Sequence, residues 1–260
     1  MELYKISIVT VSYNQGQFIR DNIESVLSQN YDNFEHIIID GGSTDNTVSI
    51  LKEYPHLNWV SEKDKGQSDG LNKGFKKATG DIIAWINSDD MLCSNALNEV
   101  NNYFVKHKDR SVLVGNQVFI DGVNKTIKTV KAQVFSADWL INGVKSAVMQ
   151  NSTFFLSDVF NKTGYLDESF HYTMDRDLFI RIAQNYQVYT IEKDLAYFRV
   201  WEDSKTYTSK ISFFKDLIKV KRKYNAPYFS LSNIWIVWQF CKEPFRKIDF
   251  LRNFVQYMKK

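Results

Sequence analysis

Cysteine is scarce in this chain: only Cys93 and Cys241 occur among its 260 residues, and they form no Cys-x-x-Cys pair. This scarcity argues against a disulfide scaffold and a cysteine-based zinc site, and it is typical of a reducing compartment. Proline and glycine are also few, with 3 and 11 residues, which excludes collagen-like and proline-rich architectures. The remaining composition, 44% hydrophobic, predicts an ordinary globular protein.

Long hydrophobic runs are missing as well. The first residues lack the apolar core and cleavage site of a signal peptide. No stretch reaches the roughly 18–20 apolar residues that a membrane-spanning helix needs, and the longest apolar stretch near the end covers only 234–241. We therefore expect a cytoplasmic protein, either in solution or bound at the inner face of the cell membrane.

Charge is divided unevenly along the chain. Residues 210–260 hold twelve Lys and Arg against three acidic residues, a net charge of +9, whereas residues 1–209 carry a net charge of −6. The sequence thus predicts a basic, aromatic, helical tail over 210–260. An anionic membrane surface, a nucleic acid or the acidic body of the same chain could each attract it. No RNA-binding pattern accompanies the aromatic residues, so we expect no nucleic-acid partner.

Strand-like and helix-like segments alternate in residues 1–95. Short runs rich in β-branched residues predict strands at 6–11, 35–40, 57–60 and 81–86, with helices between them. This order predicts an α/β fold with a mostly parallel central sheet and helices on both faces. The second part is less regular, and its expected strands are 112–115, 118–121, 151–156, 187–192 and 196–200.

Polar residues follow the predicted strands where a parallel sheet binds its ligands, at the carboxyl ends. They are Tyr13, Asp40 and the run 87–90, Asn-Ser-Asp-Asp. Asp40 could accept a hydrogen bond from a ligand N–H or cap the next helix. The carboxylates of the run suit a hard divalent cation shared with phosphate oxygens, although acidic turns before a helix have the same composition.

Four segments, taken in order, resemble the signature of the family-2 glycosyltransferases. They are 7–14 (SIVTVSYN), 38–45 (IIDGGSTD), 66–74 (GQSDGLNKG) and 80–90 (GDIIAWINSDD). The resemblance implies an inverting enzyme of the GT-A fold. It places a catalytic domain at 1–209, with a nucleotide-binding half at 1–95 and an acceptor-side half at 96–209, before the tail at 210–260.

The same resemblance implies roles for individual residues. Thr10 and Tyr13 would line the base, and Asp40 would accept a hydrogen bond from it. The remaining nucleotide-binding positions are Asp69, Asn72, Asn87 and Ser88. Asp89 would be the carboxylate that binds Mg²⁺ or Mn²⁺, at the end of a motif in which Asn87 replaces the family's first Asp.

Asp175 matches the family's catalytic carboxylate and would take the proton from the acceptor hydroxyl. Met174 precedes it where the family often has Glu. Two readings stay open here, because Asp175 could instead cap its helix and Asp177 competes for either role. Arg199 could reach the diphosphate or form an ion pair, and Trp201 stands where the family often has a His that contacts the metal or diphosphate.

The resemblance thus predicts transfer of a sugar, of hexosyl or N-acetylhexosaminyl type, from a nucleotide diphosphate to an acceptor hydroxyl. UDP is the expected nucleotide, and a glycan or lipid-linked saccharide in cell-surface polysaccharide or oligosaccharide biosynthesis is the expected acceptor. The alternative is a non-catalytic module of the same fold that binds a nucleotide sugar or a glycan.

Overall fold

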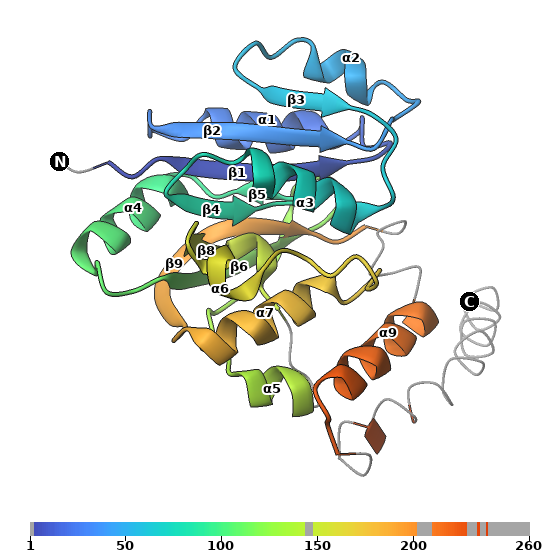
Figure 1. The fold of residues 1–260 in the computed structure, drawn as a ribbon. Helices are drawn as coiled ribbons and strands as arrows, with labels where there is room; N and C mark the ends of the chain where they lie inside the picture. The colour runs from blue at the N-terminus through green and yellow to red at the C-terminus, as the bar shows by residue number, and fades with distance from the viewer. Residues whose placement is uncertain (1–2, 144–147, 202–209, 228–232, 235–237, 239–260) are drawn as a thin grey trace, which may run out of the picture.

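Within the part of the chain that the structure describes, a single mixed sheet of nine strands forms the centre, and helices cover both of its faces (Figure 1). The structure is a computed structural model, and it describes residues 3–143, 148–201, 210–227, 233–234 and 238. The strand order is β3-β2-β1-β4-β8-β6-β9-β5, with β7 paired to β6. The predicted α/β class with helices on both faces is confirmed.

The strands of the first half run parallel. They are β1 (Ile6–Ser12), β2 (Phe34–Asp40), β3 (Asn58–Ser61) and β4 (Ile82–Trp85). Every residue of β1 and β4 is buried, as expected for strands covered on both faces. Ser12 pairs with Asp40 in the register of β1 and β2, so the carboxyl ends of these strands meet at one edge.

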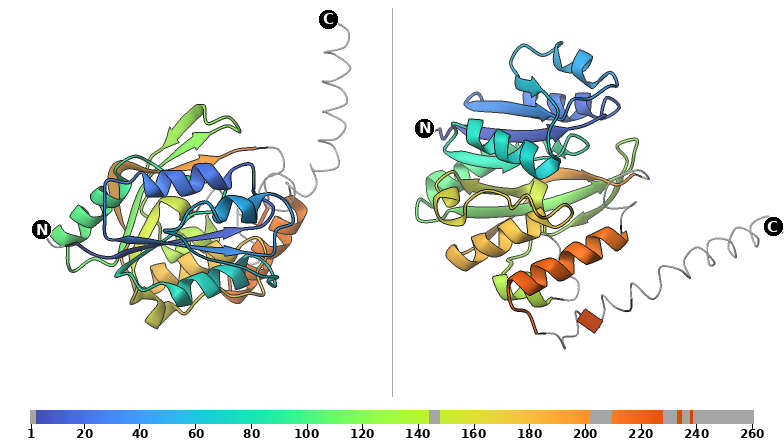
Figure 2. Two further views of the ribbon diagram at one scale, coloured as in Figure 1. Left: turned by 90° about the horizontal axis from the view of Figure 1, so that it is seen from above. Right: turned by 45° about the vertical axis from the view of Figure 1, so that its right-hand side comes forward.

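Alternate side chains of these strands enter different cores. On one face, β-strand residues pack with α1 (Ile19–Leu27), α2 (Thr47–Leu51) and α4 (Ala96–Lys106). On the other face they pack with α3 (Gln67–Lys77), whose Leu71 and Phe75 are buried. Figure 2 shows these helices in two further views, the left one from above.

The second half of the sheet is mostly antiparallel. Its strands are β5 (Met91–Leu92), β6 (Val112–Ile120), β7 (Thr126–Val130), β8 (Thr153–Leu156) and β9 (Tyr189–Arg199). β8 pairs antiparallel with both β4 and β6, whereas β6 and β9 run parallel. The sheet is therefore parallel chiefly in the nucleotide-binding half that the sequence predicts.

Two pairs of predicted strands are single long strands in the structure, which corrects those boundaries. The segments 112–115 and 118–121 both fall on β6, which ends at Ile120, and 187–192 and 196–200 both fall on β9, which runs from Tyr189 to Arg199. Gly115 does not end β6, because it gives room to Leu195 of β9: a Cβ at Gly115 would lie 2.2 Å from the Leu195 side chain. The register between β6 and β9 shifts around Asn116.

The helices α5 (Ala137–Asn142), α6 (Val159–Thr163) and α7 (Met174–Asn185) of the second half appear in the lower part of Figure 1, and their buried apolar side chains share one core with α3. A 3₁₀ turn, η1 (Gln150–Ser152), lies between α5 and α6 in the chain. Leu178, Phe179 and Ile182 of α7 are buried in the same core as α3. This packing places the amino end of α7, with Asp175, in the acceptor-side half.

The first part of the basic tail forms α9 (Lys210–Lys223), which packs on the acceptor-side half beside α5. Phe214, Leu217 and Val220 of α9 are buried, and Val220 belongs to the main core. These apolar side chains therefore cover the protein and do not face a membrane. The tail's other residues lie outside the described part, except for 224–227, 233–234 and 238. Among the described helices, none is long and apolar enough to cross a bilayer.

Candidate functional site

The carboxyl end of β1 carries an exposed aromatic ring. Tyr13 is 62% exposed, so its ring is accessible at the sheet edge. Thr10 is different: its side chain is fully buried, and its hydroxyl lies 3.0 Å from Nε2 of His36. The contact that the structure shows for Thr10 is thus with His36, and its role at the base stays a prediction. Ser12, one alternation closer to the edge, has a buried hydroxyl without a hydrogen-bond partner in the described structure, and the sequence analysis missed it.

Asp40 ends β2 with its side chain fully buried, and its carboxylate organises the turn that follows. Oδ2 accepts hydrogen bonds from the N–H groups of Gly42 (3.1 Å) and Ser43 (2.9 Å) and from the Ser61 hydroxyl (2.6 Å). Oδ1 accepts one from the Ser43 hydroxyl at 2.5 Å. The turn-forming role is thus present. Oδ2 already accepts three hydrogen bonds, so a ligand N–H could bond to Oδ2 only by replacing one of those donors, whereas Oδ1 accepts a single bond.

A second carboxylate stands close to this turn and was not singled out from the sequence. Oδ1 of Asp64 accepts the N–H of Gly66 at 2.9 Å. Its Oδ2 lies where a side chain at Gly41 or Gly70 would be, since a Cβ there would come within 2.9 or 3.1 Å of it. The signal in the sequence was these glycines, which flank the predicted nucleotide-binding turns.

Asp69 and Asn72 both lie on α3 but make different contacts. Asp69 accepts the Lys65 N–H at 3.0 Å and pairs with Lys73 at 3.3 Å, and the Lys65 bond is the main cause of its lowered pKa. Asn72 is buried and binds the loop before α7: it donates to the Leu166 carbonyl at 3.0 Å and accepts the Leu166 N–H at 2.9 Å. Asn72 thus joins the two halves of the protein.

Asn87 follows β4 and uses its amide oxygen within the protein. That oxygen accepts hydrogen bonds from Nε2 of Gln67 and Nε1 of Trp85, both at 3.0 Å. An amide oxygen has two lone pairs, so these donors leave none for a cation. Ser88 is buried beside it. Asn87 therefore shapes the end of β4 and is not a metal ligand in this arrangement.

Asp89 is the half-buried carboxylate at this strand end. Its Oδ2 accepts the indole N–H of Trp201 at 2.9 Å, and its backbone carbonyl accepts Nε of Arg199 at 2.8 Å. Burial raises the pKa of Asp89, and the Trp201 bond opposes that rise. The neighbouring Asp90 is almost completely buried, and the same cause raises its pKa well above the usual range.

Arg199 links the residues after β4 to other parts of the chain by hydrogen bonds. It is only 1% exposed and donates to Asp21 (3.0 Å), Asn124 (2.5 Å) and the Asp89 carbonyl. Its guanidinium also lies 4.4 Å from the ring centre of Phe18. Of the two roles left open for Arg199, the structure shows the ion pair, in which the Arg199 side chain is buried and the Asp21 side chain is 37% exposed.

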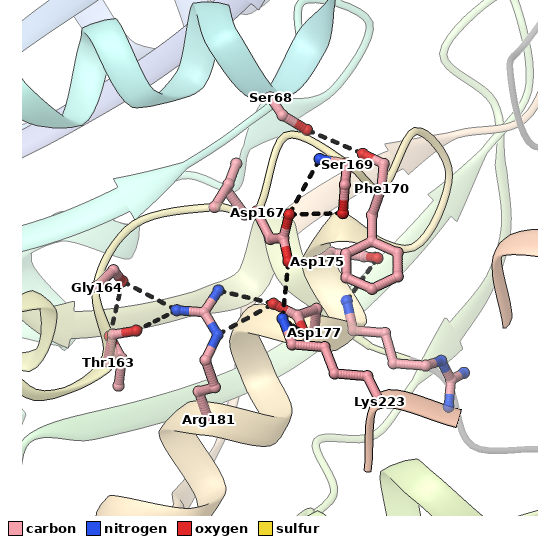
Figure 3. A network of polar contacts seen from close by, with 12 residues as sticks. Ser68, Thr163, Gly164, Asp167, Ser169, Phe170, Asp175, Asp177, Arg181 and Lys223 are labelled. Carbon is pink, nitrogen blue, oxygen red and sulfur yellow. Dashed lines mark hydrogen bonds and ion pairs between the residues drawn. The ribbon is translucent and has the colours of Figure 1, made fainter. Parts of the chain in front are cut away.

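Asp175 and Asp177 occupy the first turn of α7, and the structure separates their roles. Asp177 is fully buried, with Arg181 at 2.9 Å and Lys223 at 2.8 Å from its carboxylate (Figure 3). The Tyr224 hydroxyl also donates to this carboxylate, at 2.9 Å. Asp175 is half-buried, and its Oδ1 accepts the adjacent Arg176 N–H at 2.7 Å. Asp177 is thus a structural ion-pair residue, which leaves Asp175 as the candidate base.

A cation at this site would depend on a single protein carboxylate. Within the described ranges, no three His, Cys, Asp or Glu side chains gather into a group that could hold a metal ion. Trp201 cannot serve as a ligand because an indole nitrogen only donates. The second oxygen of Asp89 is the ligand that fits, and the cation's other ligands would have to be diphosphate oxygens and water.

Comparison with known proteins agrees with this geometry. The profile of "Glycosyl transferase family 2" matches residues 7–182. An uncharacterized glycosyltransferase of Rickettsia typhi is 28% identical over 212 residues, which are 78% of this chain and 66% of that protein. The poly(ribitol-phosphate) beta-N-acetylglucosaminyltransferase TarP of Staphylococcus aureus is 27% identical over 215 residues, 76% of this chain and 63% of TarP.

Two solved structures share the fold. S. aureus TarS 1–349, in complex with UDP-GlcNAc, superimposes with a TM-score of 0.67 at 17% identity, over 93% of this chain and 73% of that 1–349 chain. The mannosyltransferase PcManGT of Pyrobaculum calidifontis, in complex with GDP-Man and Mn²⁺, gives 0.66 at 17% identity, over 91% and 72%.

The chain spans about a third to two thirds of the length of the first curated relatives it matches. The matched profile nevertheless covers more than half of this chain, including the ends of β1, β2 and β4 and the amino end of α7. The protein therefore belongs to glycosyl transferase family 2 and has a GT-A-like fold.

Proposed function

We propose that this protein is an inverting glycosyltransferase that moves one sugar from a UDP-sugar to an acceptor hydroxyl. The observation that carries the proposal is the presence of two half-buried carboxylates, Asp89 after β4 and Asp175 in the first turn of α7. Asp89 offers one carboxylate oxygen at the sheet edge, and Asp175 is the less buried acid of the α7 turn after Asp177 has been taken up by ion pairs. Asp89 can hold the cation that binds the leaving diphosphate, and Asp175 can take the proton of the acceptor hydroxyl.

The nucleotide would lie across the ends of β1, β2 and β4. The exposed ring of Tyr13 offers an apolar face to the base. A base N–H can bond to Asp40 by replacing the Ser61 hydroxyl on Oδ2, which leaves the Gly42 and Ser43 bonds of the turn in place. Ser12, with its unpartnered hydroxyl, is a further candidate beside Thr10.

Asp89 would hold a Mg²⁺ or Mn²⁺ ion through its second oxygen. Such an ion supplies positive charge to the diphosphate as it leaves. Asn87 and Ser88 keep the end of β4 in shape beside it, since Asn87 is fixed by Gln67 and Trp85. Asp69 and Asn72 contribute indirectly, through the Lys65 turn and the loop before α7.

In the transfer step, the acceptor oxygen attacks the anomeric carbon from the face opposite the diphosphate. The new C–O bond forms as the bond from the anomeric carbon to the diphosphate oxygen breaks, which inverts the configuration. The carboxylate of Asp175 takes the hydroxyl proton, so UDP leaves as the diphosphate anion. We assign the exclusion of water and the alignment of the acceptor to the loops around α7.

Among donors we place UDP-GlcNAc first. TarP is named as an N-acetylglucosaminyltransferase, and the TarS complex contains UDP-GlcNAc. The GDP-Man complex of PcManGT makes GDP-mannose the natural comparison. The acceptor we propose is a glycan or lipid-linked saccharide of the cell surface, reached from the cytoplasmic side.

A donor panel tests this proposal. Purified protein is incubated with UDP-GlcNAc, UDP-glucose, UDP-galactose and GDP-mannose, with and without Mn²⁺, and nucleotide release is measured. We expect Mn²⁺-dependent release of UDP from one UDP-sugar, and at most a trace from GDP-mannose. Tight UDP binding without release from any donor, with saccharide acceptors present, would favour the non-catalytic binding module instead.

A further inference from the structure

The loop from Leu166 to Thr173, called here the 166–173 loop, leads directly into the turn that carries Asp175. On one side it is attached to α3 of the nucleotide-binding half. Asn72 makes two hydrogen bonds to the backbone of Leu166, and the Ser68 hydroxyl donates to the Phe170 carbonyl at 3.2 Å (Figure 3). The His171 ring also lies 3.9 Å from the position of a Cβ at Gly66. The loop thus spans the two halves.

On its other side the same loop is attached to α9. Oδ2 of Asp216 accepts the backbone N–H groups of His171 at 2.8 Å and of Tyr172 at 2.9 Å. These two residues lie within four positions of Asp175. Lys223 adds an ion pair to Asp167 at 2.8 Å and lies 5.1 Å from the ring centre of Phe170. The helix α9 therefore contacts the 166–173 loop near both of its ends, at Asp167 and at His171 and Tyr172.

Asp216 is well suited to hold backbone groups in place. It is buried, and its Oδ1 accepts a hydrogen bond from Lys219 at 2.9 Å. Burial works to raise its pKa, but Lys219 and the two backbone N–H groups outweigh burial and hold the pKa below its usual value. An ionised carboxylate makes stronger hydrogen bonds to N–H groups than a neutral acceptor does. Removing it would also leave two backbone donors to find new partners.

We propose that Asp216 is a positioning residue of the transfer reaction, which fixes the 166–173 loop so that Asp175 faces the donor held by the nucleotide-binding half. Asp216 does not touch the reacting atoms. The inference rests on the proposed function and extends it, because it makes α9 part of the catalytic unit. The predicted boundary at 209/210 then separates two segments that work together.

The test compares Asp216→Ala and Asp216→Asn with a matched control on the same helix, Lys215→Ala. Lys215 is exposed, and its replacement leaves the Lys219 bond on Oδ1 and the two loop bonds on Oδ2 of Asp216 in place. For each variant we would measure hydrogen exchange of the His171 and Tyr172 amides, calorimetric UDP binding, and kcat at saturating donor. The full chain is used throughout.

In Asp216→Ala we expect exchange of these two amides to accelerate at least about tenfold and kcat to fall about 10- to 100-fold, as misplacement of a catalytic group typically costs. The Kd for UDP should stay within about twofold, because Asp216 contacts the 166–173 loop and Lys219 and not a predicted nucleotide position. Asp216→Asn, which keeps an oxygen acceptor, should recover part of kcat. Lys215→Ala should match the wild type in all three measurements.

Two results would overturn the inference. Unchanged amide exchange in Asp216→Ala would show that the carboxylate does not hold the loop, whether or not the protein turns over a donor. Faster exchange with a wild-type kcat would show that the loop does not position Asp175. If Asp216→Ala fails to fold, Asp216→Asn decides by the same two criteria. A wild-type protein without nucleotide release would instead contradict the proposed function.

Discussion

The indole N–H of Trp201 lies 2.9 Å from Oδ2 of Asp89, so an aromatic residue holds the carboxylate that we propose as the metal ligand. The Trp201 ring is fixed in turn by an edge contact with Phe18, at 5.0 Å between ring centres. Trp201 thus orients Asp89 from the protein side and occupies one of its oxygens. The other oxygen of Asp89 is therefore held in a fixed orientation in which it can bind a cation.

Replacing Trp201 by Phe should weaken binding of Mn²⁺ in the presence of UDP. The change removes the N–H donor but keeps an aromatic ring, and loss of such a partner behind a metal ligand typically costs about tenfold or more in affinity. Mn²⁺ titration followed by electron paramagnetic resonance measures this directly. Trp139→Phe, on α5, is the matched control and should leave the affinity unchanged. Equal Mn²⁺ affinity in the Trp201 variant and the wild type would remove the orienting role.

Asp175→Asn should separate binding from chemistry. The amide keeps the shape of the side chain but cannot take a proton, and loss of a general base costs about 10²–10⁴ in rate. We expect near-normal calorimetric binding of UDP with Mn²⁺ and a kcat reduced by that factor. Asp109→Asn, at an exposed site, controls for the charge change. If UDP binding collapses and turnover at saturating donor survives, Asp175 is a binding residue.

The ion pair between Asp167 and Lys223 should make stability depend on pH in the acid range. Burial works to raise the pKa of Asp167, but its bonds to Lys223 and Ser169 lower that pKa from 3.8 to about 2. A lowered pKa in the folded state gives stability that is present above about pH 4 and is lost as pH falls towards 2. Because the side chain is 35% exposed, we expect only about 1 kcal/mol.

Urea unfolding of the wild type and of Asp167→Asn at pH 5, 3 and 2 measures that contribution. The variant should be less stable than the wild type at pH 5, and the difference should shrink towards zero at pH 2. A difference that stays constant over this range would show that the charge of Asp167 does not contribute.

The basic tail should still bring the protein to an anionic membrane surface, although α9 itself is packed on the domain. Lys and Arg near such a surface contribute up to about 1 kcal/mol each. In sedimentation experiments the full chain should pellet with anionic vesicles at low salt, detach as salt screens the charge, and ignore neutral vesicles. A chain that ignores both vesicle types would remove the membrane proposal and leave the catalytic one intact.

The sheet edge with Tyr13, Asp40 and Asp89 could be predicted because short β-branched runs and the polar residues after them are local features. Thr10 shows the limit of this reasoning. Its position two residues before Ser12 puts it on the same face of β1, and only the packing against His36 shows that its hydroxyl is buried. The alternation of side chains along a strand predicts on which face of the sheet a residue lies, but not how deeply its side chain is buried.

Long-range contacts explain the other differences. Arg199 donates to Asp21, which is 178 residues away in the chain, so no local pattern distinguishes this ion pair from a diphosphate contact. From the sequence alone, Gly115 predicts the end of a strand. In the structure the Leu195 side chain occupies the space next to Gly115, and β6 continues through this residue. The charge of the tail predicts attraction to an anion, whereas Asp216 and Lys223 bind α9 to the 166–173 loop by specific contacts.

The most direct measurement of the central claim is the anomeric configuration of the product, followed by nuclear magnetic resonance during turnover with the donor that the panel selects. With an α-linked UDP-sugar, Mn²⁺ and a saccharide acceptor, the account predicts a new β-glycosidic linkage. It also predicts that Asp175→Asn forms at most about one hundredth as much product in the same time. A product with retained α configuration, or an undiminished yield from Asp175→Asn, would contradict a single displacement with Asp175 as the base.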